Sequence, residues 1–337
     1  MTIEVVCLMR FGIVGTNFIS NNFMDAARHI KDFELVAVCS GKEENAKKFA
    51  EKYGAKKVFT SYEEMAKSGM IDAVYIATPN YLHCRQTLEF LDNNIHVLCE
   101  KPMASNIQEV KLMINKALEK NVVLMEAMKP TLMPNFIAVK ENLKNIGKIR
   151  RAIFNYGKYS SRYDAYRDGI VLNAFKPEMS NGSIMDIGVY SVFNAVTLFG
   201  MPKRVYGNGV MLESGVDGIG TVILSYEDKE VILMHSKVTD TTLPSEIQGE
   251  DGTIVIDDIN SPSKITLYDR SRHITNLTRS QIGDNMFYEI DEFMKVVKLG
   301  EQESKTNTHE ISLMVHEIIT EVRKQIGLKF IADEIDM

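Results

Sequence analysis

The sequence has few cysteines, and none of them lies in the spacing of a metal site or a redox pair. The four cysteines, Cys7, Cys39, Cys84 and Cys99, are widely separated and mostly lie in apolar runs. A C-x-x-C spacing is the usual sign of zinc binding or thiol redox chemistry, and the scattered histidines form no ligand cluster. We therefore predict no disulfide, no metal site, and reduced, buried thiols in a cytoplasmic protein.

Basic stripes, long apolar runs and low-complexity linkers are lacking as well. With 39 Lys and Arg against 45 Asp and Glu, the formal net charge is −6, which argues against nucleic acid as a partner. No apolar run approaches the roughly 18 residues of a membrane span, and the N-terminus lacks the basic flank and cleavage site of a signal peptide. We expect no membrane partner. Because Met9 directly precedes the first apolar run, residues 1–8 are expected to add little to function.

The first third of the chain alternates short apolar runs with helical patterns. This alternation predicts βαβ units and a parallel sheet. The apolar runs lie at Phe11–Val14, Glu34–Cys39, Ala73–Ala77, His96–Cys99 and Val122–Met125, and the helices between them include Lys42–Tyr53, Leu82–Asn93 and Ile107–Lys120.

The pattern changes after Met128, where alternating runs separated by turn residues predict one large, mostly antiparallel open sheet backed by helices. The length favours two domains, which we place at 9–128 and 129–337. The segment Asp164–Arg167 is expected to be a loop that gates a site. The expected strands are Arg150–Lys158, Arg204–Leu212, Gly218–Tyr226, Val231–Val238, Leu243–Gly249, Thr253–Asp257 and Lys264–Tyr268, and the expected helices are Leu132–Leu143, Ser183–Phe199, Asn285–Leu299 and His309–Ile326.

A glycine turn follows the first strand, in the stretch RFGIVGTNFIS. The G-x-G-x-x-G frame of dinucleotide-binding turns falls on Gly15, Asn17 and Ser20, so only its first glycine is kept. Asn tolerates a positive φ better than other non-glycine residues, and Ser is small enough for close helix–strand packing. By itself the turn fits a phosphate-binding site and an ordinary tight turn of an α/β protein about equally well.

Three further segments make the nucleotide interpretation stronger when they are combined with this turn. ATPNYLH ends the fourth parallel run, CEKP ends the fifth, and NGSIMDIGVY opens a helix of the second half. In this order they resemble the Gfo/Idh/MocA family over essentially the whole chain. Tyr190, where many members have His, makes the chain most similar to glucose-fructose oxidoreductase and dimeric dihydrodiol dehydrogenase. The resemblance implies a Rossmann dinucleotide-binding domain at 9–128 and an α+β substrate and oligomerisation domain at 129–337.

The chemistry of such a site can also be argued from the residues. Ligands of open parallel sheets bind outside the carboxyl ends of the strands. Hydride transfer at a carbinol carbon needs a group that exchanges the hydroxyl proton, and we predict Tyr190 in this role. Lys101 would lower the phenol pKa, and Asp186, four residues before Tyr190, would orient the substrate or Lys101. Taken singly, each of these residues could have a purely structural role: the Lys–Pro pair as a turn, Asp186 as a helix cap and Tyr190 as a core aromatic. The resemblance to the family implies that all three lie at one interdomain cleft.

The end of the second strand decides the expected cofactor. NAD sites usually carry an acidic residue there, whereas this chain has Ser40, Gly41 and Lys42 and no acid before Glu43. We therefore favour NADP, with NAD as the alternative. His83 either shapes the nicotinamide pocket or merely packs. The full set of expected cofactor residues is Gly12, Gly15, Thr16, Asn17, Phe18, Ile19, Ser40, Gly41, Lys42, Ala77, Thr78, Pro79, Asn80, His83, Glu100 and Lys101.

The substrate side is less well defined by the sequence. Arg162, Tyr163, Asn173 and Phe175, with Lys101, Asp186 and Tyr190, are candidates for binding a hydroxyl-rich ring, although packing explains Phe175 slightly better. The leading hypothesis is an NADP-dependent oxidoreductase acting on a secondary alcohol or ketone of a sugar, cyclic polyol or dihydrodiol. A non-catalytic nucleotide-dependent sensor and an oxidation-dependent glycosidase are the alternatives. A homodimer or higher homo-oligomer is expected, because one face of the open sheet needs a cover.

Overall fold

The structure is a computed structural model that describes residues 8–334, which form two compact units. Unit 1 holds the residues up to Ala104, together with Glu109–Ala127 and Ile282–His309; unit 2 holds Ser105–Gln108, Met128–Gln281 and the residues from Glu310 onward. The predicted ranges 9–128 and 129–337 were contiguous, whereas 282–309 folds with unit 1. The expectation for residues 1–8 lies almost wholly outside the described residues.

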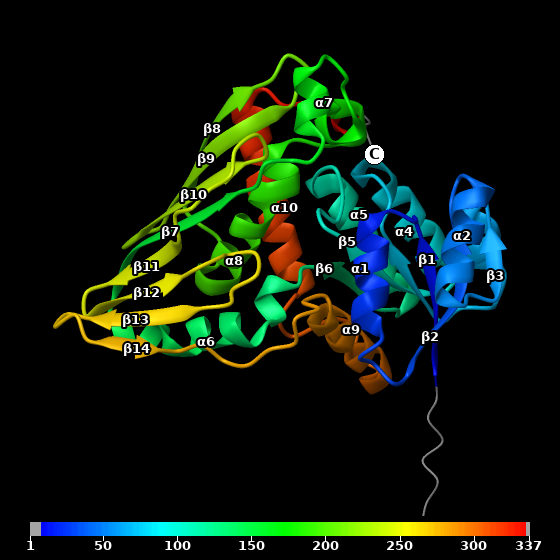
Figure 1. The fold of residues 1–337 in the computed structure, drawn as a ribbon, viewed down its shortest axis with the longest axis horizontal. Coiled ribbons are helices and arrows are strands. Elements are labelled where there is room, and N and C mark those ends of the chain that lie inside the picture. Colours follow the sequence, from blue (N-terminus) through cyan, green and yellow to red (C-terminus); the bar gives the residue numbers. More distant parts are fainter. Residues whose placement is uncertain (1–7, 335–337) are drawn as a thin grey trace, which may run out of the picture. The chain divides into compact units, whose positions relative to one another are not determined.

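Unit 1 is built on a parallel sheet with the strand order β3-β2-β1-β4-β5-β6 (Figure 1). Right-handed crossovers from the central pair β1 and β4 place helices on both faces of this sheet. Its strands are β1 Met9–Val14, β2 Phe33–Cys39, β3 Lys57–Phe59, β4 Ala73–Ile76, β5 His96–Glu100 and β6 Leu124–Ala127, and its helices are α1 Phe18–Ala27, α2 Glu43–Tyr53, α3 Tyr62–Lys67, α4 His83–Asp92, α5 Ile107–Lys120 and α9 Phe287–Leu299.

Aromatic packing explains why α9 joins unit 1 although it lies late in the sequence. The ring centroid of Phe293 on α9 lies 5.9 Å from that of Phe11 on β1, and both side chains are fully buried. Phe23 of α1 stacks on Tyr75 of β4 at 3.9 Å in the same core. Burying one such aromatic ring stabilises a fold by about 1.5–3 kcal/mol. Helical periodicity located α9, but it could not say which core the helix would cover.

Unit 2 is built on an eight-stranded sheet with the order β14-β13-β12-β11-β7-β10-β9-β8. Only the β7–β10 pair is parallel, so the expectation of a mostly antiparallel sheet is confirmed. The strands are β7 Ile149–Gly157, β8 Arg204–Met211, β9 Asp217–Ser225, β10 Glu230–Ser236, β11 Ser245–Gly249, β12 Gly252–Ile256, β13 Ile265–Asp269 and β14 Ile274–Asn276. The short, exposed β14 was not predicted, because its three residues show no alternation.

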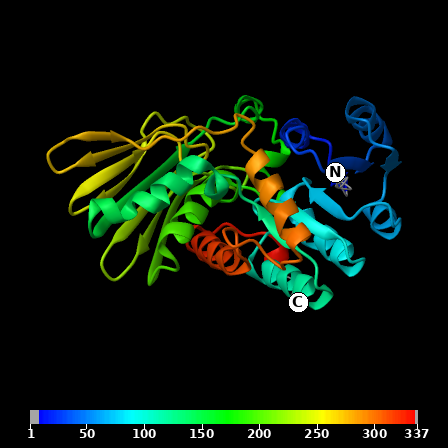
Figure 2. The same ribbon diagram turned by 90° about the horizontal axis from the view of Figure 1, so that it is seen from below.

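Helices cover one face of this sheet, as Figures 1 and 2 show for α6, α8 and α10. The strands present buried apolar residues to them at every second position, as Val222 and Leu224 do on β9. The helices are α6 Pro134–Asn142, α7 Tyr163–Arg167, α8 Val189–Phe199 and α10 His309–Ile326. Shorter turns of helix occur at Asn80–Leu82 in unit 1 and at Pro130–Leu132, Leu143–Ile146, Asn173–Phe175, Pro177–Met179, Ile184–Gly188 and Ile331–Asp333.

One expectation about local structure is wrong. The segment Asp164–Arg167, predicted to be a loop, lies in α7, where the Tyr159 hydroxyl donates to Asp164 and the rings of Tyr163 and Tyr166 stack at 5.7 Å. The helical stretch Pro177–Phe199 is long and apolar enough to cross a membrane by length and composition alone, but 72% of its window is buried inside the structure. A helix that packs against other elements on most sides needs apolar residues around most of its surface, as a membrane helix does.

The cysteines of the described residues are free and buried, as predicted. They are Cys39, Cys84 and Cys99; Cys7 lies outside the described residues. Burial, together with the negative charge of nearby glutamates, raises the pKa of Cys39 and of Cys84 to about 12. These thiols are therefore protonated and unreactive at neutral pH.

Candidate functional site

The glycine turn after β1 requires Gly15 at its first position. Gly15 has φ +100°, and a Cβ there would lie 2.5 Å from the carbonyl oxygen of Ala77. The turn cannot easily move away, since the Gly15 N–H donates to Cys39 and the Ala77 N–H donates to Val14. The turn thus brings bare backbone against the end of β4, as a phosphate-binding turn does.

Asn17 holds the turn in shape, but with a different backbone conformation from the one expected. Its φ is −86°, so it does not occupy the left-handed region; instead it is the N-cap of α1. Its Oδ1 accepts from the Ile19 N–H at 2.9 Å, and its Nδ2 donates to the Ala77 carbonyl at 2.7 Å. The Ser20 hydroxyl donates to the Gly15 carbonyl at 2.8 Å. The two residues that replace glycines therefore tie the turn to β4 and to α1.

The start of α1 can accept an anion. Its first turn carries no acidic residue, and the N-terminus of a helix attracts negative charge. Phe18, the first residue of α1, is 64% exposed. Gly15 leaves a cradle that a Cβ would fill, so these residues fit the pyrophosphate of a dinucleotide.

The second loop of this edge follows β2. The Thr16 hydroxyl donates to the Ser40 hydroxyl at 3.5 Å and so links this loop to the glycine turn. Lys42 is exposed and is the N-cap of α2. Glu43, the first acidic residue after the strand, pairs with Lys47 at 2.8 Å. The exposed charge next to Ser40 is therefore positive.

His83 connects the third loop to the fourth. It is fully buried, with Nδ1 3.0 Å from the Pro102 carbonyl oxygen and Nε2 2.9 Å from the Thr78 carbonyl oxygen. Burial lowers the pKa of His83, although both carbonyls oppose this effect. The Thr78 hydroxyl donates to Gln86 at 2.6 Å. Because the ring is enclosed, His83 acts on the loops through their backbone and presents no surface to a ligand.

Lys101 directly follows β5, and its backbone contacts the buried carboxylate of Glu100. The Tyr75 hydroxyl donates a short hydrogen bond to Glu100, and the Lys101 N–H donates to the other oxygen of that carboxylate at 3.2 Å. The Lys101–Pro102 peptide is cis. Gly15, Ser40, Pro79 and Lys101 thus follow β1, β2, β4 and β5 at one edge of the sheet, because parallel strands end on the same side.

Asp186 and Tyr190 belong to unit 2, at the start of the helix that the sequence predicted. Asp186 lies in a π-helical turn, Ile184–Gly188, which runs directly into α8, where Tyr190 is the second residue. π-Helical turns are frequent at functional sites. Tyr190 is partly exposed, and its ring meets that of Tyr156 edge-to-face at 5.7 Å. The expected helix therefore begins with wider winding, which periodicity could not detect.

A buried polar cluster holds the start of this helix, and sequence reasoning missed it. Asp217 of β9 accepts from the Ile184 N–H at 2.7 Å, and His235 of β10 lies 2.9 Å from the Ser183 hydroxyl. A Cβ on Gly182, at φ +148°, would lie 2.2 Å from Asp217. Burial raises the pKa of Asp217 from 3.8 to about 6 and lowers that of His235 to about 3.

Lys237 is the second group that the sequence gave no reason to select. It follows β10 and is fully buried. Its Nζ donates to the Ala174 carbonyl at 2.6 Å and to Asn181 at 3.2 Å, and it lies 3.4 Å from Asp186 Oδ2. It also lies 4.9 Å from the centre of the Phe175 ring. A lysine that follows an apolar strand is normally expected at the surface, so the sequence gives no indication that Lys237 is buried.

The four candidate substrate residues differ in exposure. Arg162 and Asn173 are exposed and Tyr163 is partly exposed, whereas Phe175 is fully buried in the core of unit 2. Phe175 is therefore a packing residue beneath Lys237, and its assignment as a substrate contact is wrong. Its ring packs against Tyr163 at 5.6 Å, which explains why an apolar residue is needed there.

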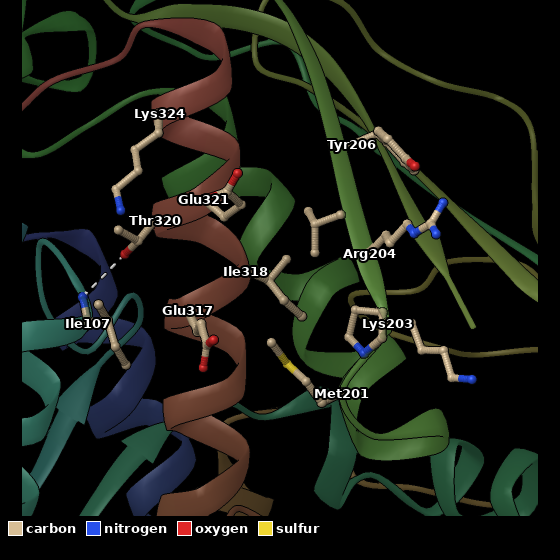
Figure 3. A pocket seen from close by; sticks show the side chains of 12 residues that line it. Ile107, Met201, Lys203, Arg204, Tyr206, Glu317, Ile318, Thr320, Glu321 and Lys324 are labelled. Carbon is tan, nitrogen blue, oxygen red and sulfur yellow. Dashed lines mark hydrogen bonds between the residues drawn. The ribbon is translucent and has the colours of Figure 1, made fainter. Parts of the chain in front are cut away.

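A pocket of about 510 Å³ opens elsewhere in unit 2, between α10 and the start of β8 (Figure 3). Charged side chains of both signs line it, among them Arg204, Glu317 and Lys324. At its edge the Ile107 N–H donates to the Thr320 hydroxyl at 3.2 Å. None of the predicted site residues lines this pocket.

The fold and the loop chemistry define a class, the oxidoreductases with a Rossmann dinucleotide-binding unit. Residues 9–128 match the family model described as "Oxidoreductase family, NAD-binding Rossmann fold", and residues 139–255 match the GFO/IDH/MocA C-terminal domain. The chain belongs to the Gfo/Idh/MocA family and is an NAD(P)-dependent oxidoreductase.

Relatives that match over the full length of the chain agree with this membership. The chain is 51% identical over 327 residues to scyllo-inositol 2-dehydrogenase (NADP(+)) IolU of Bacillus subtilis, covering 97% of this chain and 100% of the relative. It is 31% identical to trans-1,2-dihydrobenzene-1,2-diol dehydrogenase of Xenopus tropicalis, covering 95% and 99%. The fold is similar to that of KijD10, a 3-ketoreductase from Actinomadura kijaniata, with a TM-score of 0.81 at 22% identity, covering 95% and 98%.

Proposed function

We propose that this oxidoreductase uses NADP to oxidise a secondary alcohol of a cyclic polyol, or to reduce the corresponding ketone. The single observation that carries the proposal is the 51% identity over the full length to a scyllo-inositol 2-dehydrogenase that uses NADP(+). The similarity to dihydrodiol dehydrogenases supports the same chemistry, since these too act on hydroxyl groups borne by a six-membered carbon ring. The substrate is a small molecule, and the enzyme acts in the cytoplasm.

The loop after β2 supports NADP over NAD. Lys42 is exposed beside Ser40, and Glu43 pairs with Lys47. A 2′-phosphate would gain a charge-assisted hydrogen bond from Ser40 and Lys42, whereas the ribose of NAD would find no acid at the strand end. In a fluorescence titration of NADPH and NADH, we expect tighter binding of NADPH, and Lys42→Ala should reduce this preference by about tenfold. Equal or tighter binding of NADH by the wild type would contradict this assignment.

The bound cofactor supplies or accepts the hydride, and the residues of this chain handle the proton. Tyr190 is the general acid/base for the substrate hydroxyl. Lys101 lowers the pKa of its phenol through its positive charge, and Asp186 orients the substrate. Support comes from the placement of Lys101 at the cofactor edge of unit 1 and of Tyr190 at the π-helical start of α8.

Tyr190→Phe tests the catalytic assignment. The variant keeps the ring contact with Tyr156 but lacks the hydroxyl, so we expect kcat to fall by about 10²- to 10⁴-fold, with the affinity for NADPH unchanged. The assay follows NADPH absorbance with scyllo-inositol and dihydrodiols as substrates. Tyr156→Phe is a matched control. It removes a phenol hydroxyl from the ring that packs against Tyr190, and that hydroxyl accepts from Asn260. Turnover by Tyr190→Phe at the wild-type rate would refute the role of the phenol.

The uncovered face of the unit 2 sheet supports a homodimer. Tyr206, Ile223, Ile232 and Ile153 form a row across β8, β9, β10 and β7 through direct strand pairing. Tyr206 is 50% exposed and Ile223 is 36% exposed. An apolar row of this kind on a sheet face is typical of a protein interface. A second copy of the chain would cover it, and light scattering should show that Ile223→Lys produces a monomer, whereas a monomeric wild type would contradict this proposal.

A further inference from the structure

We infer that Lys237 is a positioning residue, which holds the carboxylate of Asp186 in place for the reaction. The inference rests on the proposed function, in which Asp186 orients the substrate. Neither the sequence motifs nor the family resemblance assigns a role to Lys237. Its position in the structure requires an explanation, because lysine is almost never fully buried unless it is paired.

The surroundings of the Lys237 ammonium group explain why it can be buried. Its Nζ donates to the Ala174 carbonyl at 2.6 Å and to Asn181 Oδ1 at 3.2 Å, and it forms an ion pair with Asp186 Oδ2 at 3.4 Å. The Phe175 ring lies 4.9 Å away and adds a cation–π contact. Without such partners, burial of an ammonium ion would cost several kcal/mol.

The two partners of the ion pair differ in exposure, and this difference indicates that Lys237 positions Asp186 and not the reverse. The Lys237 side chain is 0% exposed, whereas that of Asp186 is 39% exposed. Lys237 is therefore fixed by the core, and Asp186 reaches from this fixed point toward solvent. The first residue of the π-helical turn, Ile184, is held separately, because its N–H donates to Asp217. The backbone and the side chain of the segment thus have separate anchors on neighbouring strands.

The Lys237 charge also acts on Asp217, where it counteracts the effect of burial. Burial raises the pKa of Asp217 to about 6, while the Ile184 N–H and Lys237 lower it. Lys237 therefore pairs with Asp186 and acts through its charge on Asp217, and both carboxylates serve one segment, Asn181–Tyr190. A cation at this point favours the ionised form of each of them.

The experiment is a double-mutant cycle between Lys237→Met and Asp186→Asn. Methionine fills nearly the same volume beside Phe175 but carries no charge. With scyllo-inositol and NADP⁺, we expect Lys237→Met to lower kcat/KM by about 10- to 100-fold, with NADPH affinity unchanged. The double variant should lie within about threefold of Asp186→Asn, because Lys237 then has no carboxylate to hold. If the losses of the single variants multiply instead, Lys237 does not act through Asp186 and the inference is wrong.

The same four proteins are compared in urea unfolding, which does not depend on activity. Asp186→Asn should lower stability more in the wild type, where a buried cation loses its partner, than in Lys237→Met. An equal effect in both backgrounds would overturn the pairing itself. If the two substitutions are coupled in stability but Asp186→Asn and Tyr190→Phe both keep full activity, the proposed function is refuted. The ion pair between Lys237 and Asp186 would then have a structural role alone. Lys229→Met is the matched control, since Lys229 pairs with Asp228 at 2.8 Å in the turn between β9 and β10, and its activity should match the wild type.

Discussion

Replacing Asp217 with asparagine separates the cost of ionising this buried carboxyl group from its hydrogen bond. Asparagine keeps an oxygen that can accept from the Ile184 N–H, and it cannot ionise. Burial raises the pKa of Asp217 from 3.8 to about 6 in the folded protein. The folded state therefore binds a proton more tightly than the unfolded chain does. This contribution to stability is fully present below pH 3.8 and is lost as the pH rises through 6.

The size of the effect follows from the two pKa values. A difference of about two pH units, at about 1.4 kcal/mol each, gives about 3 kcal/mol. As the pH falls from 7.5 to 3.5, the free energy of unfolding of the wild type should rise by this amount relative to Asp217→Asn. His235 does not disturb the comparison, because burial lowers its pKa to about 3 and it is present in both proteins. The measurement is urea unfolding of both proteins by circular dichroism at each pH.

The control is Asp228→Asn, at a partly exposed position in the turn between β9 and β10. Lys229 lowers the pKa of Asp228 through a hydrogen bond and its charge, so the sign of the pH dependence should be reversed and its size small. A difference between wild type and Asp217→Asn that stays constant with pH would refute the argument. A wild type that loses stability relative to this variant at low pH would show that Lys237 outweighs burial at Asp217.

Two further predictions concern the cofactor edge and the proton transfer. Gly15→Ala should weaken NADPH binding by more than tenfold in a fluorescence titration, because the added Cβ meets the Ala77 carbonyl at 2.5 Å in a backbone conformation that itself costs about 1–2 kcal/mol; affinity equal to the wild type would show that the turn is not a phosphate cradle. Gly283→Ala is its control, since a Cβ there meets nothing within 4 Å and Gly283 is not among the predicted site residues. Lys101→Ala should move the pH–rate profile for alcohol oxidation to higher pH, because the phenol of Tyr190 loses a stabilising cation. An unchanged profile with reduced kcat would assign Lys101 to positioning alone.

Local patterns in the sequence located the loops after β1, β2, β4 and β5, because these loops directly follow apolar runs that the sequence shows. Once alternating runs place Gly15, Ser40 and Lys101 after parallel strands, the geometry of a parallel sheet brings them to one side. The prediction for the backbone of Asn17 is wrong: a positive φ was expected there, and its φ is −86°. The structure shows a helix cap instead, and both explanations favour the same residue type.

The substrate side was harder to predict because its groups are held by partners far away in the sequence. Lys237, Asp217 and His235 meet the segment Asn181–Tyr190 only through the pairing of β9 and β10 and the packing of the helix on them. Phe175 shows the opposite error, since an aromatic residue near polar neighbours was considered for substrate binding and lies in the core.

Patterns of neighbouring residues were enough to predict the family, the parallel and antiparallel sheets and the glycine turn, and to select Lys101, Asp186 and Tyr190 as candidates. The folded chain was needed to show that residues 282–309 fold with unit 1, that the helix of Tyr190 starts with a π turn, and that a buried lysine pairs with Asp186. These features depend on which surfaces are buried against each other. Burial sets the energy of a charge and the place of an apolar face, and burial is a property of the folded chain.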